Sequence, residues 1–130
     1  MSLLNKINKV KEFHVAFGIQ NNEEPTTQLT KEEIQLRFDL IKEENEEYLD
    51  AANQGDLVEI ADALGDQLYI LFGTMLKHGL QYKIEEVFDE IQRSNMSKLG
   101  ADGKPIYRED GKVMKGPNYF KPNIKNILDR

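Results

Sequence analysis

The sequence predicts an all-α protein: a bundle of four to five helices followed by a C-terminal loop or short β-hairpin tail. Three observations predict this class. Apolar residues recur every three to four positions over most of residues 3–98, which is the period of one face of a helix. Capping residues and glycines divide this region into helix-sized segments. After Leu99, frequent glycines and prolines exclude another long helix.

The composition predicts one domain, residues 1–130, in three parts. A chain of 130 residues can bury a core without disulfides. The parts are an N-terminal helix and loop (1–30), central helices (31–98) and an irregular tail (99–130). The chain has no cysteine, which excludes thiolate catalysis, cysteine-ligated zinc and disulfides, and we expect a cytoplasmic protein.

The net charge of −6 argues against binding to nucleic-acid polymers or to anionic membranes, because those surfaces are bound by an excess of Lys and Arg. The longest apolar run, Leu68 to Leu76, is far shorter than the ~20 residues of a membrane span. The N-terminus lacks the apolar core of a signal peptide. A phosphate-bearing partner would therefore be small and bound by local basic groups or by a metal ion.

The first predicted helix covers about residues 3–17, and His14 lies on its apolar stripe. A histidine in that position is interpreted as a half-buried packing residue without chemistry. The polar run at 18–30 has no periodicity and predicts a loop. Thr30 followed by Glu33 predicts a capping box at the start of the next helix.

The second and third predicted helices, about 31–53 and 57–78, form a hairpin. Gly55 suits the left-handed residue that ends a helix, and Asp56 can cap the next one. The third helix has a broad apolar face, which implies burial on more than one side. Because this face is too broad for one four-helix protomer, we predict a homodimer with helices packed across its interface. The face comprises Ile60, Ala61, Leu64, Leu68, Leu71, Phe72 and Met75.

The fourth predicted helix, about 82–98, has an apolar line that continues into Asn95 and Lys98. These two residues either line a polar pocket or cap the fraying end of the helix. In the tail, Asp110-Gly111 between apolar pairs predicts a small hairpin or an ordered loop. The tail carries an excess of basic residues, which could fold over an anionic ligand or could neutralise the acidic bundle as a solvated end.

Two acidic pairs face each other across the predicted hairpin. Glu44 and Glu47 are three residues apart and share one helix face, as do Glu59 and Asp62 on the next helix. At ~1.5 Å per residue, Glu47 and Asp62 lie at the same height on either side of the turn, and Glu44 falls near Asp66. Carboxylates packed this closely raise one another's pKa values or bind a counter-ion, so the pattern predicts a divalent-metal site.

Structural explanations compete with this metal site. Glu59 has the spacing of a capping box with Asp56, and the run 43–47 could be an exposed charged surface. Glu43 with Glu46 is an alternative register for the first pair. A di-iron bundle is excluded, because neither histidine has a glutamate three residues before it.

These motifs resemble the all-α nucleoside triphosphate pyrophosphohydrolase superfamily, which includes MazG, dimeric dUTP pyrophosphatases and phosphoribosyl-ATP pyrophosphohydrolase. Residues 43–47, read as Glu-Glu-x-x-Glu, and Glu59-x-x-Asp62 are similar to its metal-binding signature, although the spacer between them is short for the superfamily. Four further sequence segments are most similar to the phosphoribosyl-ATP pyrophosphohydrolase-like branch: 59–66, 88–98, 102–105 and 116–119. The resemblance spans most of the chain and implies a bundle of the MazG-like type.

The resemblance implies a bound Mg²⁺ or Mn²⁺ and hydrolysis of a nucleotide substrate, a nucleoside triphosphate or a phosphoribosyl-ATP-like nucleotide, to the monophosphate and pyrophosphate. The implied metal ligands are Glu44, Glu47, Glu59 and Asp62. A divalent ion of this kind prefers oxygen ligands, which fits a site made of carboxylates and substrate phosphates. The central helices are then the catalytic part of the chain, and the tail covers the substrate.

The resemblance also assigns expected roles outside the metal ligands. Glu43 lies one turn from Glu47, and we expect it to act as the base for the attacking water. Asn95 and Lys98 are implied to bind the nucleotide. Lys115 and Tyr119 of the tail are expected to bind substrate, with the lysines opposing the charge of pyrophosphate. The alternative function is a non-catalytic helical module that binds a partner protein through its apolar faces.

Overall fold

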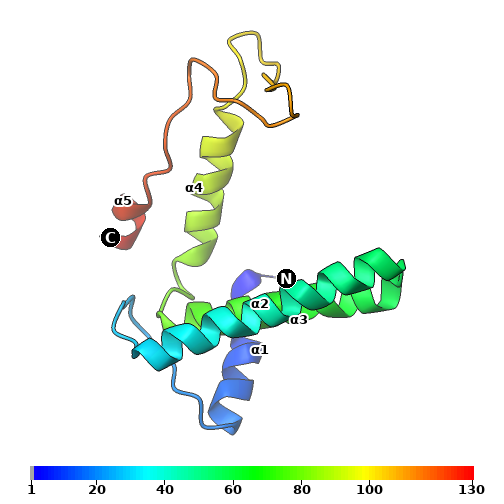
Figure 1. Cartoon of the computed structure of the whole chain (residues 1–130). Helices are drawn as coiled ribbons and strands as arrows, with labels where there is room; N and C mark the ends of the chain where they lie inside the picture. Colours follow the sequence, from blue (N-terminus) through cyan, green and yellow to red (C-terminus); the bar gives the residue numbers. More distant parts are fainter. Residues whose placement is uncertain (1) are drawn as a thin grey trace. The chain divides into compact units, whose positions relative to one another are not determined.

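The structure is a computed structural model that describes residues 2–130. In that range it contains five helices and no β-strand, which confirms the predicted all-α class (Figure 1). The helices are α1 (Leu3–Ala16), α2 (Lys31–Gln54), α3 (Leu57–Lys77), α4 (Ile84–Met96) and α5 (Ile124–Leu128). The chain divides into two compact units, Met1–Tyr82 and Lys83–Arg130. No described helix has the length and apolar character needed to cross a membrane.

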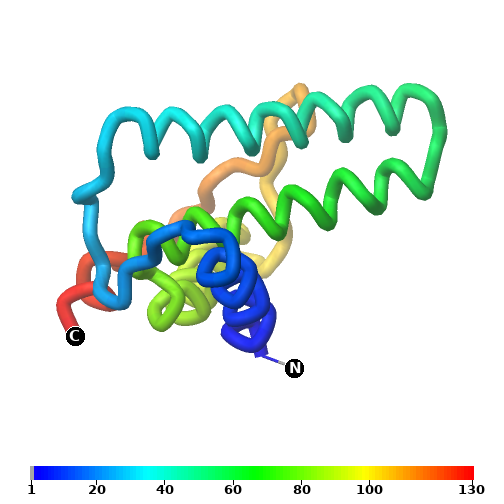
Figure 2. The backbone as a smooth tube through the Cα atoms, turned by 90° about the horizontal axis from the view of Figure 1, so that it is seen from below, coloured from blue at the N-terminus to red at the C-terminus, as the bar shows by residue number. Residues whose placement is uncertain are grey.

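In the first unit, α2 and α3 form an antiparallel hairpin, and α1 packs against α3. Figure 2 shows α2 and α3 running side by side to the turn that joins them. Gly55 ends α2 with a φ of 67°, in the left-handed region that favours glycine. The side chain of Asp56 accepts a hydrogen bond from the amide of Glu59 at 3.2 Å. The predicted stop and restart of the helices is therefore confirmed.

The loop before α2 is fixed at both of its ends. The Thr30 hydroxyl accepts from the Glu33 amide and the Glu33 carboxylate accepts from the Thr30 amide, each at 3.1 Å, which is the predicted capping box. Upstream, the amides of Asn22 and Thr26 donate to carbonyls at the end of α3, each at 2.9 Å. Gly79 allows this approach, because a Cβ at that position would lie 2.0 Å from the carbonyl oxygen of Glu24.

The buried core is small and is centred on the contact between α1 and α3. Its largest fully buried side chains are Ile7 and Leu76. Along the hairpin, by contrast, apolar side chains are exposed: Leu57 by 76%, Leu64 by 46% and Leu68 by 53%. A single copy of the first unit therefore leaves the broad face of α3 largely open, and the homodimer stays a prediction.

The second unit consists of α4, a long tail and α5. The fourth helix is shorter than predicted and has no side-chain hydrogen bond at its N-terminus. The predicted hairpin around Asp110-Gly111 is present as one isolated antiparallel bridge, between Tyr107 and Val113, rather than as strands. The sequence did not predict α5, whose five residues follow a capping side chain, Asn123.

Candidate functional site

Three carboxylates from the two helices of the hairpin meet in the first unit. Glu44 and Glu47 come from α2 and Asp66 comes from α3, and each offers an oxygen within 4.8 Å of the other two. We call these three residues the acidic cluster. Glu44 and Glu47 share a face because they are three residues apart, and the antiparallel turn brings Asp66 to the same height.

Burial and like charge act together in the acidic cluster. Burial, with added repulsion from Glu47, Asp66 and Glu43, raises the pKa of Glu44 to about 7. Burial also raises the pKa of Asp66, and the carboxylates of Asp62 and Glu47 add to this shift. One oxygen of Glu44, Oε2, is buried and has no hydrogen-bond partner. The cluster therefore carries negative charge that the described part of the chain does not neutralise.

A divalent cation such as Mg²⁺ or Mn²⁺ fits this arrangement. Hard cations prefer carboxylate oxygens, and the cluster offers three of them within ligand distance of one another. The unpartnered Oε2 of Glu44 is the kind of acceptor that a cation would satisfy. Next to the cluster, the side-chain amide of Gln67 on α3 donates to the side-chain oxygen of Asn45 on α2 at 3.2 Å, which links the two helices at this height.

The other two predicted ligands, Glu59 and Asp62, lie outside the acidic cluster but next to it. Together with Glu47 and Asp50 they line a hollow of about 400 Å³ between α2 and α3. Asp62 also affects the pKa of Asp66, which shows that the two carboxylates are neighbours. The hollow therefore extends the line of acids from the cluster towards the turn of the hairpin.

A capping role explains the position of the Glu59 amide but not that of its carboxylate. Its amide donates to the side chain of Asp56, as in a capping box. In a full box the Glu59 carboxylate would accept from the amide of Asp56, but that amide donates to the carbonyl of Ala51 at 3.1 Å. The carboxylate of Glu59 lines the hollow and is available for another role.

The sequence predicted different roles, or none, for three further acids near the site: Asp66, Asp50 and Glu43. Asp66 belongs to the acidic cluster, although the sequence motif assigned the α3 ligands to Glu59 and Asp62. The count of residues from the turn had placed Asp66 near Glu44, and the cluster contains both of them. Asp50 lines the hollow and was not predicted. Glu43, the expected base, is exposed on α2 and contributes to the shifted pKa of Glu44.

The predicted substrate-binding residues all lie in the second unit. Asn95 is exposed near the end of α4. The amide of Gly116 donates to the carbonyl of Lys98 at 2.8 Å, so the tail returns to the end of that helix. The ammonium group of Lys115 lies 4.8 Å from the centre of the Tyr119 ring. The structure thus brings Lys115 and Tyr119 together beside the backbone of Lys98.

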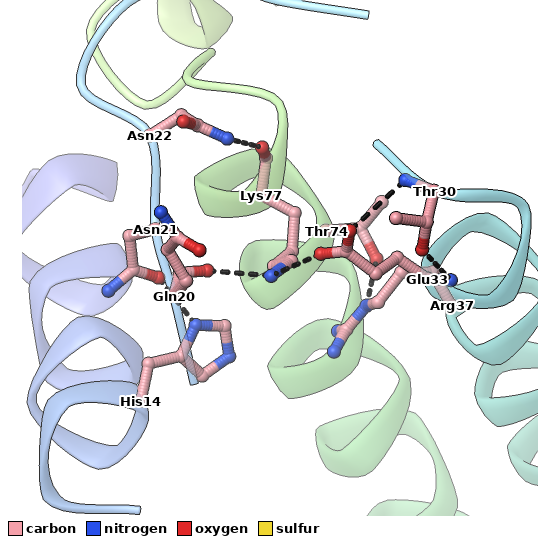
Figure 3. Close-up of polar contacts among 9 residues, drawn as sticks. All are labelled: His14, Gln20, Asn21, Asn22, Thr30, Glu33, Arg37, Thr74 and Lys77. Carbon is pink, nitrogen blue, oxygen red and sulfur yellow. Dashed lines mark hydrogen bonds and ion pairs between the residues drawn. The ribbon is translucent and has the colours of Figure 1, made fainter. Parts of the chain in front are cut away.

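A second group of charged residues lies where α2 begins and α3 ends (Figure 3). Lys77 is 6% exposed, and its ammonium group lies 3.0 Å from the Glu33 carboxylate and 2.7 Å from the Gln20 carbonyl. Arg37 donates to the Thr74 hydroxyl at 2.9 Å and to the Ile70 carbonyl at 2.6 Å. We call Glu33, Arg37, Lys77 and His14 the cationic network.

His14 completes the cationic network and has a structural role. It is 3% exposed, and its Nδ1 lies 2.6 Å from the side-chain oxygen of Asn21. A Cβ at Gly73 would lie 2.6 Å from the Arg37 guanidinium and 3.0 Å from His14 Nε2, so glycine allows both side chains to approach α3. Burial lowers the pKa of His14, and the nearby charges of Arg37 and Lys77 lower it further. The packing role predicted for this histidine agrees with these contacts.

Comparisons with known proteins confirm the resemblance seen in the motifs. A model of the family described as phosphoribosyl-ATP pyrophosphohydrolase matches residues 10–95. The chain is 35% identical over 99 residues to an uncharacterized protein of Acanthamoeba polyphaga mimivirus, covering 69% of this chain and 37% of the viral protein. It thus spans little more than a third of that relative. A crystal structure of a "putative NTP pyrophosphohydrolase" from Exiguobacterium sp. 255-15 matches 99% of this chain and 95% of its own, with a TM-score of 0.52 and 25% identity.

Proposed function

This chain belongs to the phosphoribosyl-ATP pyrophosphohydrolase family, and we propose that it is a metal-dependent nucleotide pyrophosphohydrolase. Its substrate would be a nucleoside triphosphate or a phosphoribosyl-ATP-like nucleotide, and its products the nucleoside monophosphate and pyrophosphate. The acidic cluster is the observation that carries the proposal. Three carboxylates within 4.8 Å, one with a buried unpartnered oxygen, are costly to keep without a cation.

The proposed metal ion is Mg²⁺ or Mn²⁺. Glu44, Glu47 and Asp66 would hold it, and Glu59 and Asp62 are proposed as further ligands from the adjoining hollow. When bound, a divalent ion would neutralise phosphate charge and lower the pKa of a coordinated water. The carboxylates must lose their protons to bind the metal, so the raised pKa of Glu44 links metal binding to pH.

Glu43 is proposed as the base of the reaction. The oxygen of a water molecule attacks a phosphorus atom of the nucleotide, the phosphoanhydride bond breaks, and the pyrophosphate group departs with the bonding electrons. The water gives up a proton, which the carboxylate of Glu43 accepts. Glu43 is exposed on α2, directly before Glu44, so it can reach a water at the edge of the cluster.

The residues of the second unit are proposed to bind the nucleotide. Lys98 and Lys115 supply positive charge that opposes the negative charge growing on the leaving pyrophosphate. Asn95 is exposed and can donate hydrogen bonds to the substrate. Tyr119 offers an aromatic ring, and the charge of Lys115 near that ring holds the two side chains together.

The exposed apolar face of α3 is proposed to pack against a second copy of the chain. Leu57, Leu64, Leu68 and Leu71 are each between 43% and 76% exposed and recur at helical spacing. A continuous apolar stripe of this length on a soluble protein favours an interface. Sedimentation analysis at micromolar concentration should give twice the mass of one chain, and a monomeric mass would contradict the homodimer.

The same exposed face favours a second candidate, a non-catalytic module that binds a different protein. That function would need no acidic cluster, whereas the proposed hydrolase requires one. The two candidates are separated by incubating the protein with a panel of nucleotides and Mg²⁺ or Mn²⁺, with pyrophosphate and orthophosphate detected separately. Metal-dependent release of pyrophosphate supports the hydrolase. No release from any nucleotide with either metal would favour the binding module.

A further inference from the structure

The tail of the second unit returns along one face of α4 as a strap, residues 116–123. The backbone of Phe120 is held at both of its polar groups. The hydroxyl of Ser94, a residue that is 2% exposed, donates to the Phe120 carbonyl at 2.8 Å. The Phe120 amide donates to the hydroxyl of Ser97 at 3.2 Å, and that hydroxyl donates to the Ser94 carbonyl at 2.5 Å. We call this arrangement the serine clamp.

Contacts on both sides of the serine clamp fix the course of the strap. At its far end, the amide of Asn123 donates to the Glu90 carboxylate at 2.7 Å. The guanidinium of Arg93 lies 4.7 Å from the centre of the Phe120 ring. At its near end, Gly116 lies against the end of α4, where a Cβ would be 2.2 Å from the carbonyl oxygen of Leu99. The strap therefore has one course along α4.

This course gathers three lysines at the end of α4. The amide of Gly116 donates to the carbonyl of Lys98 at 2.8 Å, which brings the preceding residue, Lys115, to the same place. Within the loop between them, the amide of Gly100 donates to the carbonyl of Lys104 at 2.7 Å. We call Lys98, Lys104 and Lys115 the lysine loop.

Within the described part of the chain, the three lysines of the lysine loop have no side-chain carboxylate partner, a property that they share with Lys83, Lys112 and Lys121 and that separates them from four other basic residues of the second unit. Arg93, Arg108, Lys125 and Arg130 each pair with a carboxylate. Among residues 2–130, no ion pair is formed by any of the three loop lysines. Between Lys98 and Lys104 the loop holds one carboxylate, that of Asp102, which accepts from the Lys104 amide at 3.0 Å. Three lysines and one carboxylate leave a net positive charge, which favours an anion with several charges, such as a chain of phosphates.

We propose that Ser94 and Ser97 are positioning residues, which hold the strap so that the lysine loop binds the polyphosphate chain of the substrate. The proposal rests on the proposed function for the identity of that substrate. The serines do not touch the nucleotide: they fix Phe120, and the strap in turn places Lys115 beside Lys98. Lys104, which lies in the motif at 102–105 but has no role expected from the sequence, becomes part of the binding site.

Binding of inorganic tripolyphosphate tests this proposal. Isothermal titration of the full chain in EDTA avoids any contribution from metal at the acidic cluster. Ser94→Ala and Ser97→Ala each remove one hydrogen bond to Phe120, and each should weaken binding by up to about fivefold, given a net value of about 1 kcal/mol for such a bond. Ser97→Thr keeps the hydroxyl and should bind as the wild type does. Lys125→Ala, a lysine paired with Asp129, is the matched control and should leave binding unchanged.

Three further measurements separate positioning from simple loss of structure. Hydrogen exchange at the Phe120 amide should become faster in both serine-to-alanine variants. The KM for a nucleotide substrate should rise while kcat and the affinity for Mn²⁺ stay constant, because the acidic cluster lies in the other unit. Lys104→Ala removes an exposed side chain without disturbing the clamp, and it should weaken tripolyphosphate binding as well.

Three results would overturn the proposal: no tripolyphosphate binding by the wild type, unchanged binding in the serine variants despite faster exchange, or unchanged exchange at Phe120. A failure of the proposed function gives a different result. In that case tripolyphosphate would bind and the serine variants would weaken it, but no nucleotide would release pyrophosphate.

Discussion

The open end and the middle of the α2–α3 hairpin carry charged side chains in opposite states. Where α2 begins, the ammonium group of Lys77 in the cationic network contacts a carboxylate and a carbonyl oxygen. The guanidinium of Arg37 donates to a hydroxyl and to a carbonyl oxygen. About three turns further along α2, the acidic cluster places three carboxylates within 4.8 Å of one another and leaves Glu44 Oε2 without a donor.

This difference separates charge that the chain neutralises from charge that we propose binds a metal ion, within one pair of helices. The network is satisfied by groups of the chain itself, so its removal should cost stability. The cluster is left incomplete by the chain, and like charges held together in a partly dry site destabilise the protein until a cation binds. Each prediction below changes one of these two groups and states which property of the protein should respond.

The largest expected effect comes from the acidic cluster. Glu47→Gln removes a carboxylate from the proposed metal site and should lower Mg²⁺-dependent pyrophosphate release by at least about a hundredfold. The melting temperature of the metal-free protein should stay constant or rise, because one of three like charges is lost. A pyrophosphate assay and thermal unfolding in EDTA measure the two effects.

Glu46→Gln is the matched control for this variant. Glu46 is exposed on the same helix and pairs with Lys42 at 3.6 Å, so its loss should change neither activity nor melting temperature by much. A large fall in the EDTA melting temperature of Glu47→Gln alone would show that Glu47 is structural, and the distinction between the acidic cluster and the cationic network would be lost.

The next effect comes from the cationic network. Lys77→Met keeps the apolar stem but leaves the Gln20 carbonyl and the Glu33 carboxylate without their ammonium partner. The free energy of unfolding should fall by about 1–3 kcal/mol, as for other losses of a buried charged hydrogen bond. Urea unfolding measures this free energy. The control is Lys42→Met, which replaces an exposed lysine. Weaker Mn²⁺ binding by folded Lys77→Met would contradict independent roles for the cationic network and the acidic cluster.

Local signals in the sequence were enough to predict the hairpin and the approach of Asp66 to Glu44, but not which acids make up the cluster. Caps and glycines act within a few residues, so Thr30, Gly55 and Asp56 could be identified from spacing. Which acids of α3 approach α2 depends on the rotation of the helix about its axis. That rotation is set by packing along the whole hairpin, and it brings Asp66 rather than Asp62 into the cluster.

The second unit was harder to predict, because its order comes from contacts between distant residues. The strap depends on Ser94 and Ser97 binding the backbone of Phe120, more than twenty positions away. Hydroxyls that bind backbone groups at such separations leave no periodic pattern in the sequence. The five residues of α5, between proline-rich and terminal segments, are also too few to show a helical period.

A smaller effect links the acidic cluster to pH. Burial chiefly raises the pKa of Glu44 from 4.5 to about 7, so the folded metal-free protein keeps a proton that the unfolded chain has lost. The stability from this proton is complete below pH 4.5 and is lost as the pH rises through 7. Metal needs the deprotonated carboxylate, so Mn²⁺ affinity should fall below pH 7, approaching tenfold per pH unit.

Calorimetric titration with Mn²⁺ at pH 6, 7 and 8 measures this dependence. Glu44→Gln should bind Mn²⁺ more weakly at pH 8 and should show a flatter dependence on pH, because the group that takes up the proton is absent. Equal Mn²⁺ affinity of the wild type at pH 6 and pH 8 would show that Glu44 is not a ligand.

The smallest expected effect is at the cationic network and has the opposite sign. Burial, helped by Arg37 and Lys77, lowers the pKa of His14 below 6.5, while the bond to Asn21 acts against this shift. The unfolded chain therefore takes up a proton first, and the stability from neutral His14 is lost as the pH falls below 6.5.

His14→Gln keeps a donor for Asn21 but cannot take up a proton. The difference in melting temperature between wild type and variant, measured in EDTA, should shrink from pH 8 to pH 5, since only the wild type loses stability at His14. Glu44 is present in both proteins, so its opposite contribution cancels from the difference. A constant difference across this range would mean that His14 titrates in the folded protein as it does in the unfolded chain, and the network would then tolerate an added positive charge.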